Sequence, residues 1–263
     1  MISLAIHGAA GRMGRRLIDL GAQDPDLQLT AALESSQHPQ LGQDAGAIAG
    51  CGELGLPLSA SWSEPPQAVI DFSVPAGAES ITQICRDQKT PLVMATTGLS
   101  DQQKQALTDA SQEIPIVWAP NMSLAVNLVM KLSSIAGETL KGTTGGVDVE
   151  ILERHHRFKE DAPSGTALRF GEIIADAMGL SKHTHGREGI TGKRPAEEIG
   201  YHALRVSDDP GQHTIVFGMM GELIELSVKA SNRDCYALGA LAAAKFVAGK
   251  APGIYGMDDV LGL

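Results

Sequence analysis

The feature that most constrains the fold is an alternation, along residues 2–126, of short apolar runs with longer amphipathic segments. Residues 69–72, 92–95 and 116–119 are strand-like and lack a regular polar alternation, and each run precedes a turn and a polar stretch of helical length. Strands buried on both faces of a sheet need such runs, and helical crossovers between them make the strands parallel. The pattern therefore predicts an α/β unit with helices on both faces of a parallel sheet.

A different pattern follows the glycine-rich turn at residues 142–146. Val147, Val149 and Ile151 alternate with polar residues, which is typical of a strand with one covered face. We expect a helix before this turn, at residues 123–140. After the turn we expect a second helix at residues 166–178 and two further strands at residues 214–217 and 223–228. These elements predict a central α+β domain with an open mixed sheet.

The two patterns divide the chain into two domains. Residues 1–126 and 234–263 are expected to form one domain, because the Ala-rich helix expected at residues 234–249 can pack back on the first unit. Residues 127–233 are expected to form the other domain. Within it, the polar residues 181–195 are interpreted as a mobile loop.

A glycine turn directly follows the first expected strand. Gly8, Gly11 and Gly14 lie in HGAAGRMG, where backbone N–H groups and a helix N-terminus can face a pyrophosphate. A tight turn with no ligand is the alternative, because a glycine triplet alone is weak evidence. The order of strand, turn, helix, strand and Glu34 favours dinucleotide binding, since an acid at this place can accept hydrogen bonds from ribose hydroxyls.

The residues beside this turn bear on the choice of cofactor. Arg12 can lie over an adenine or reach a 2′-phosphate, or it can simply face solvent. Ser35 follows Glu34, where an arginine would favour NADPH. A carboxylate without an adjacent cation repels the extra phosphate, so the sequence favours NADH over NADPH.

The segment ERHHRFKEDAPSGT, residues 153–166, carries the most chemistry. If the strand continues far enough, His155, Arg157 and Lys159 share one face and His156 points the other way. The Ser164-Gly165-Thr166 turn then opens a helix whose first N–H groups can hold a carboxylate. An imidazole, an ammonium and a helix N-terminus together suit a small dicarboxylate substrate that is protonated during the reaction.

Other interpretations of these residues are simpler. Adjacent histidines can bind a metal, but His155 and His156 diverge on a strand and no third ligand is suitably spaced, so no metal is expected. Lys159 can be an ordinary surface lysine, and Ser164 and Thr166 can be helix caps, which is compatible with ligand binding. The remaining histidines show no spacing of interest and are expected in loops or on the surface; they include His183, His185, His202 and His213.

Charge and cysteine content exclude several other classes of protein. The chain has 21 basic and 31 acidic residues, a formal charge of −10, which opposes binding to nucleic acid or an anionic membrane. Cys51, Cys85 and Cys235 have no spacing typical of disulfides or zinc sites. Neither a signal peptide nor an apolar run of about 18 residues is recognisable. A cytoplasmic protein without a membrane span is therefore expected.

Several motifs along the chain resemble those of the 4-hydroxy-tetrahydrodipicolinate reductase (dihydrodipicolinate reductase) family, and they occur in the same order as in that family. The most specific is ERHHRFKEDAPSGTAL, and the similarity covers nearly the whole chain. The other motifs are GAAGRMG, ATTG at residues 95–98, PNMS at 120–123, REGITGKR at 187–194 and KASNR at 229–233.

The resemblance implies a Rossmann-like dinucleotide-binding domain at residues 1–126 and 234–263 and a substrate-binding and oligomerisation domain at residues 127–233. It also implies a homotetramer built through the central sheets and a reductase of lysine and diaminopimelate biosynthesis. Its reaction reduces 4-hydroxy-tetrahydrodipicolinate to tetrahydrodipicolinate with loss of water, using NADH or NADPH. It implies that His155 is the proton donor, that Lys159 binds and helps protonate the substrate, and that His156 lines the pocket. Ser164, Gly165 and Thr166 would hold a substrate carboxylate. Cofactor positions would be Gly8, Gly11, Arg12, Met13, Gly14, Glu34, Thr96, Gly98, Ala119, Asn121 and Met122.

Two residues depart from the pattern of the family. Phe158 replaces a histidine often found in the signature, and Ser35 replaces the basic residue of members that accept NADPH. A different reductase on the same scaffold is one alternative function, although none of the three cysteines lies in an active turn as a semialdehyde dehydrogenase would require. A nonenzymatic NAD(H) sensor is the other, but a sensor would have no reason to keep His155 and Lys159 together with the Ser164 turn.

Overall fold

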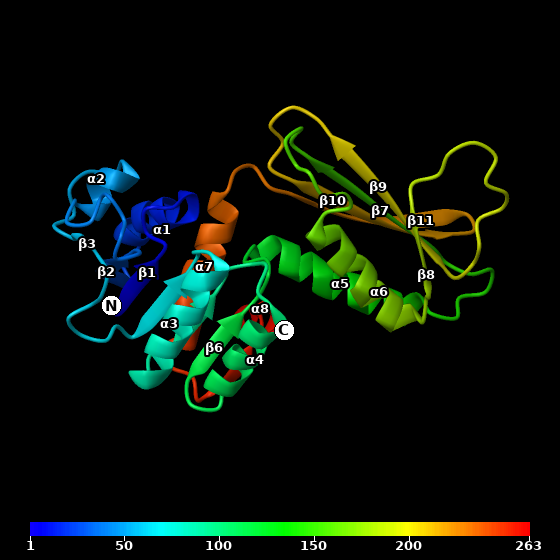
Figure 1. The fold of residues 1–263 in the computed structure, drawn as a ribbon. Coiled ribbons are helices and arrows are strands. Elements are labelled where there is room, and N and C mark those ends of the chain that lie inside the picture. Colours follow the sequence, from blue (N-terminus) through cyan, green and yellow to red (C-terminus); the bar gives the residue numbers. More distant parts are fainter. The chain divides into compact units, whose positions relative to one another are not determined.

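The computed structural model describes residues 1–263 and separates into two compact units (Figure 1). Unit 1 contains residues 1–124 and 233–263, and unit 2 contains residues 125–232. The chain therefore leaves unit 1, builds unit 2 and returns. No helix in either unit combines the length and the apolar content needed to cross a membrane.

Unit 1 is built on a seven-stranded parallel sheet with the order β12-β6-β5-β4-β1-β2-β3. The strands are β1 (Ile2–His7), β2 (Leu27–Leu33), β3 (Leu58–Ser59), β4 (Ala68–Asp71), β5 (Leu92–Met94), β6 (Pro115–Trp118) and β12 (Gly253–Tyr255). The helices are α1 (Arg12–Gln23), α2 (Ala45–Ala49), α3 (Pro75–Asp87), α4 (Asp101–Ala110), α7 (Asp234–Val247) and α8 (Met257–Leu261).

Helices cover both faces of this sheet, as the all-apolar runs require. On one face, Leu17 of α1 and Ala240 of α7 share a buried cluster with Ile6 and Ile70 of the strands. On the other face, helices α3 and α4 pack against alternate residues of the same strands, such as Val69. The parallel α/β prediction is confirmed, and the C-terminal helix packs back on unit 1 as expected.

Unit 2 has a mixed five-stranded sheet with the order β11-β10-β7-β9-β8. Strand β10 is antiparallel to β7 and β11, whereas β9 is parallel to β7 and β8. The elements are α5 (Leu124–Leu140), β7 (Asp148–His155), α6 (Gly165–Met178), β8 (Lys182–His185), β9 (Glu198–Arg205), β10 (Gln212–Met219) and β11 (Glu222–Lys229). The predicted open mixed sheet is confirmed.

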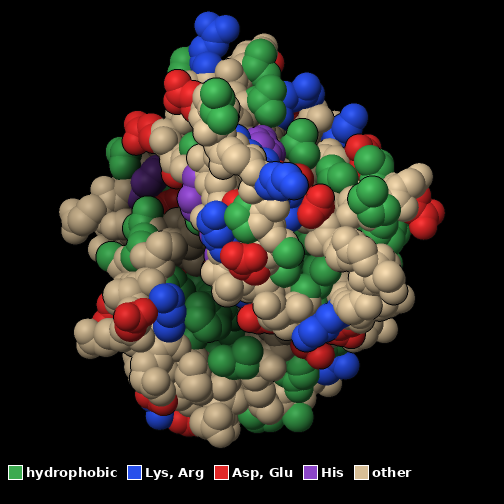
Figure 2. All heavy atoms as spheres, turned by 90° about the vertical axis from the view of Figure 1, so that its right-hand side faces the viewer, with side chains coloured by type: hydrophobic (Ala, Val, Ile, Leu, Met, Phe, Trp, Pro, Cys, Tyr) green, Lys and Arg blue, Asp and Glu red, His purple; other side chains and the backbone are tan.

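The two faces of the unit 2 sheet differ in burial. Ile151 and Phe217 belong to a buried cluster with Phe170 of α6. On the opposite face, Leu152, Leu204 and Leu223 are 38%, 50% and 61% exposed. Figure 2 looks onto the side of the molecule where Figure 1 has β8 and β11, and apolar side chains are exposed there among basic, acidic and histidine side chains. Much of this face of the sheet is thus uncovered within the chain.

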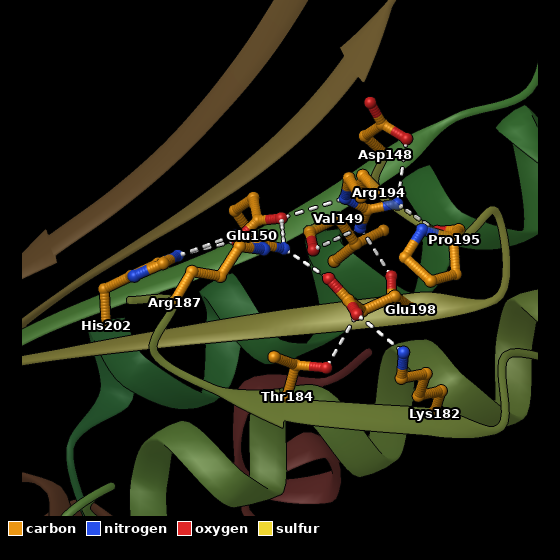
Figure 3. A network of polar contacts seen from close by, with 10 residues as sticks. All are labelled: Asp148, Val149, Glu150, Lys182, Thr184, Arg187, Arg194, Pro195, Glu198 and His202. Atoms are coloured by element: carbon orange, nitrogen blue, oxygen red, sulfur yellow. Dashed lines mark hydrogen bonds and ion pairs between the residues drawn. The ribbon is translucent and has the colours of Figure 1, made fainter. Parts of the chain in front are cut away.

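The segment expected to be a loop at residues 181–195 is partly a strand, because Lys182–His185 forms β8 beside β9. The rest is attached to the open sheet face by two arginines (Figure 3). Arg187 Nη2 lies 2.6 Å and Arg194 Nε 2.9 Å from Glu150 Oε1, and Arg187 also pairs with Glu198. The expectation of a loop was therefore wrong for residues 182–185, which pair with β9, whereas residues 186–195 contain no helix or strand.

Candidate active site

The glycine turn of unit 1 brings three backbone segments too close together for side chains. A Cβ on Gly14 would lie 2.1 Å from Gly8 O and 2.6 Å from Ala9 Cα. Gly8 has φ +78°, and its Cβ would lie 2.7 Å from Phe72 O. The glycines therefore let helix α1 start directly against the turn that follows β1.

The N-terminus of α1 has the properties of an anion site. Its N-cap, Gly11, supplies no side chain to bond the first N–H groups, and no acidic residue lies in the first turn. The helix dipole and these N–H groups favour a negatively charged group. Arg12, at the first helical position, is exposed and adds a positive charge, while Met13 packs partly against the core.

Glu34 follows β2 and faces the glycine turn. Its Oε1 accepts a hydrogen bond from Ala10 N at 3.1 Å, and Oε2 accepts one from Ser35 N at 3.2 Å. The carboxylate is therefore held in place beside the turn. No cationic side chain forms an ion pair with Glu34.

A buried carboxylate links the carboxyl ends of three strands. Asp71, fully buried at the end of β4, contacts His7 Nδ1 at 2.6 Å and accepts a hydrogen bond from Thr96 Oγ1 at 2.6 Å. Thr96 Oγ1 in turn accepts a hydrogen bond from Ser73 N. The Thr96 hydroxyl thus fixes this end of the sheet, while Gly98, with φ +76°, has open space around it.

In the turn after β6, the side chains of Ala119 and Met122 point into the core of unit 1. Ala119 and Met122 are 5% and 1% exposed, and both belong to the core. A Cβ on Gly239 of α7 would lie 1.7 Å from Met122 O, so α7 packs directly on this turn. Asn121 Oδ1 accepts a hydrogen bond from Ser123 N, which closes the turn.

In unit 2, the end of β7 carries a buried acid beside the predicted proton donor. Glu153 and His155 share the covered face of the sheet, and His155 Nδ1 lies 2.5 Å from Glu153 Oε2. The side chain of Glu153 is fully buried and that of His155 is 12% exposed. Burial by itself raises the pKa of Glu153, but hydrogen bonds from His155 and Arg205 outweigh it and hold this pKa at about 2.

Arg205 at the end of β9 connects this acid to the segment that carries Lys159. Its Nη1 and Nη2 donate to the two oxygens of Glu153 at 2.9 and 2.8 Å, and Nη2 also donates to Asp161 O at 2.6 Å. Lys159 Nζ donates to Asp161 Oδ1 at 2.8 Å. This hydrogen bond is the main reason that the pKa of Asp161 is lowered.

Ser164 begins helix α6 and is held on three sides. Its Oγ accepts a hydrogen bond from Ala167 N as the helix cap and lies 3.0 Å from His213 Nε2, while Ser164 N donates to Glu153 Oε1 at 3.2 Å. Its side chain is buried, whereas Gly165 is exposed with open space around it, and Thr166 is partly exposed. The groups that can meet a ligand anion are thus those of the first turn of α6.

The predicted parity of the signature segment holds only to His155, because β7 ends there. Residues 156–159 form a turn in which Lys159 N donates to His156 O. Lys159 therefore does not continue the face of His155 by strand alternation. His156 Nδ1 is buried without a hydrogen-bond partner, and the Phe158 side chain is 77% exposed.

Sequence reasoning missed three residues of this cluster. Glu153 appeared only as one letter of the signature motif, with no role assigned to it. Arg205 lies 52 residues further along the chain and was not considered. His213 was expected in a loop or on the surface, yet it is 5% exposed on β10 and pairs in register with Glu153. Burial first, and the charge of His155 second, lower the pKa of His213 to about 4. His213 is therefore neutral near pH 7.

His202 was likewise expected on the surface, but it is partly buried on the open sheet face. Its Nε2 lies 2.7 Å from Glu150 Oε2. Burial tends to raise the pKa of Glu150, but Arg187, Arg194 and His202 lower it to about 2. Strand β7 thus carries one carboxylate with several hydrogen-bond partners on each face, and only Glu153 belongs to the signature segment.

Comparison with known proteins identifies the family of the chain. Residues 2–122 match the family model described as dihydrodipicolinate reductase, N-terminus, and residues 125–261 match the one described as its C-terminus. A 4-hydroxy-tetrahydrodipicolinate reductase of Rhodopirellula baltica is 59% identical over all of this chain and 96% of its own length. One from Hahella chejuensis is 45% identical over the full length of both chains.

A solved structure agrees with these matches. The dipicolinate-bound dihydrodipicolinate reductase of Paenisporosarcina sp. TG-14 superposes with a TM-score of 0.77 and 25% sequence identity, over 97% of each chain. The predicted resemblance is confirmed by sequence and by fold: the chain belongs to the dihydrodipicolinate reductase family and is a pyridine-nucleotide-dependent reductase.

Proposed function

We propose that this chain reduces 4-hydroxy-tetrahydrodipicolinate to tetrahydrodipicolinate, with loss of water, in lysine and diaminopimelate biosynthesis. The observation that carries the proposal is the grouping, in unit 2, of His155, Lys159 and the first turn of α6 around the buried Glu153–Arg205 pair. This grouping offers an acid, a cation and a helix N-terminus to a small dicarboxylate.

In this proposal unit 1 holds the nicotinamide cofactor. The backbone of Gly8, Gly11 and Gly14 and the start of α1 would receive the pyrophosphate, and Glu34 would accept hydrogen bonds from the adenosine ribose. The absence of space for any Cβ at Gly14 supports this use of the turn. Residues of the neighbouring turns would lie beside the nicotinamide; they are Thr96, Gly98, Ala119, Asn121 and Met122.

When bound, the cofactor supplies a hydride to a ring carbon of the substrate. The residues of unit 2 do the rest. Lys159 and the first-turn N–H groups at Gly165 and Thr166 bind the substrate carboxylates and orient the ring. His155 gives the proton that balances the hydride, as a general acid. His156 follows the donor in the chain, and its buried Nδ1 has no hydrogen-bond partner in the protein.

We further propose that NADH is the preferred cofactor and that NADPH remains usable through Arg12. Glu34 is fixed next to Ser35, where the chain has no cation to pair with a 2′-phosphate. We also propose a homotetramer assembled through the uncovered face of the unit 2 sheet, since Leu204 and Leu223 on that face are half or more exposed.

The direct test of the function is a coupled assay in which the unstable substrate is generated freshly and the oxidation of NADH is followed by absorbance. We expect NADH consumption that depends on both the substrate and the enzyme. A chain that binds NADH but consumes none under these conditions would be a sensor, and the proposed function would be wrong.

A further inference from the structure

The inference concerns Glu153 and rests on the proposed role of His155 as proton donor. The Glu153 carboxylate accepts four hydrogen bonds from groups that come from different parts of unit 2: His155 Nδ1, Ser164 N and the two Nη atoms of Arg205. Its side chain is fully buried. Neither solvent nor a ligand can therefore reach the carboxylate, and it interacts only with these three residues.

We infer that Glu153 is the positioning residue of this active site, which fixes the ring of His155 and ties it to the start of α6, with Arg205 as its counter-ion. An ionised carboxylate only accepts hydrogen bonds, so a 2.5 Å contact with Nδ1 requires a proton on Nδ1. The transferable proton of His155 is then the one on Nε2. Glu153 thereby decides which ring nitrogen reacts.

The surroundings of Nε2 agree with this assignment. A Cβ on Gly211 would lie 2.9 Å from His155 Nε2, and Gly211 has φ +137°, so this position leaves no room for a side chain against the reacting nitrogen. His213 packs edge-on to His155, with ring centroids 5.3 Å apart, and contacts Ser164 rather than His155 through its own Nε2. No other acid contacts the His155 ring in the ion pairs of this unit.

The same carboxylate sets the distance between the proton donor and the carboxylate-binding turn. Glu153 Oε2 contacts His155, while Oε1 accepts from Ser164 N at the cap of α6. Arg205 extends the connection to Asp161 O, and Asp161 holds Lys159. One buried ion pair thus orders both groups that are proposed to meet the substrate, which a simple structural ion pair would not need to do.

The test compares Glu153→Gln with wild type and with the matched control Glu150→Gln. Glu150 lies on the opposite face of β7 and is also bonded by two arginines and a histidine, but it does not contact His155. We expect Glu153→Gln to lower kcat by roughly ten- to a hundredfold, the loss seen when the hydrogen-bond partner that orients a metal-bound histidine is removed, with substrate KM changed less than about threefold. Glu150→Gln should keep kcat within about twofold of wild type when its oligomeric state is unchanged.

A spectroscopic measurement gives a readout that does not depend on activity. In ¹⁵N spectra of the imidazole, neutral His155 of the wild type should carry its proton on Nδ1, and Glu153→Gln should shift the proton toward Nε2, because a glutamine amide can donate as well as accept. Glu153→Asp, which keeps the charge, should retain the wild-type tautomer. Unchanged tautomer and unchanged kcat in folded Glu153→Gln would overturn the inference.

Glu153→Gln leaves the partly buried Arg205 without its carboxylate partner, so the single variant can lose stability. The double variant Glu153→Gln/Arg205→Met removes both charges and should fold, as judged by circular dichroism, while kcat stays low. Recovery of wild-type kcat in the double variant would mean that Glu153 only neutralises Arg205, and the inference would be wrong. An inactive wild type would count against the proposed function, whereas the tautomer spectra would still test Glu153.

Discussion

Replacing Gly14 by Ala tests whether the turn of unit 1 holds the cofactor. The new Cβ would lie 2.1, 2.6 and 2.7 Å from Gly8 O, Ala9 Cα and Ala9 O, all of them backbone atoms that cannot rotate away. Since ordinary carbon contacts start near 3.4 Å, the start of α1 must move from the turn by about 1 Å. A shift of that size breaks N–H hydrogen bonds to a pyrophosphate, and one charge-assisted bond is worth roughly 1.5–3 kcal/mol.

We therefore expect Gly14→Ala to raise the Kd for NADH at least tenfold in isothermal titration calorimetry, and to destabilise the protein by about 1–3 kcal/mol through overpacking. Gly249→Ala is the matched control: Gly249 is exposed in the same unit, and no atom lies within 4 Å of its Cβ position. If folded Gly14→Ala binds NADH as wild type does, the turn does not hold the cofactor and the reasoning fails.

Further predictions concern catalysis, cofactor choice, assembly and pH. His155→Ala should lower kcat by roughly 10²–10⁴ with a smaller change in substrate KM, whereas Lys159→Ala should lower kcat and raise KM, and both should keep the wild-type Kd for NADH in calorimetry; a normal kcat in His155→Ala would rule out its role as donor. Steady-state kinetics should give a higher kcat/KM with NADH than with NADPH, and equal values in the wild type would contradict the assignment. Ser35→Arg should shift the ratio of the two kcat/KM values toward NADPH by about tenfold, which is the worth of one charge-assisted hydrogen bond. Light scattering should show a tetramer at micromolar concentration, and Leu223→Lys should give a smaller species; a monomeric wild type would refute assembly through the sheet. Because the pKa of Glu153 falls from 4.5 to about 2 on folding, its contribution of at most about 3 kcal/mol should be complete above pH 4.5 and be lost as the pH falls through 2, which urea unfolding of wild type and Glu153→Gln at several pH values can measure; the same pH dependence in both would exclude this contribution.

The fold was predictable because its signals are local. The all-apolar runs of unit 1 report burial on both faces, and the alternation of Val147, Val149 and Ile151 reports a sheet with one covered face. Both patterns depend on residues close together in the chain. The start of α6 was equally readable, since Ser164 caps it as the sequence indicates.

The parts of the site that escaped prediction depend on strand register. Glu153 meets His213 because β7 and β10 pair antiparallel, and it meets Arg205 because β7 and β9 pair parallel. No pattern within one strand contains this information. The parity argument also failed at Lys159, because nothing in the sequence marked the end of β7 at His155 as clearly as the glycines mark other turns.

The return of the chain to unit 1 has a consequence for folding during synthesis. Helix α7 provides five fully buried residues to the cluster on one face of the first sheet: Ala237, Ala240, Ala243, Ala244 and Val247. Until that helix leaves the ribosome, the apolar face formed by β1, β4 and β5 has only part of its cover, while all of unit 2 is already available to fold. The unit synthesised first is thus completed last, and part of its apolar sheet face stays exposed until α7 is made.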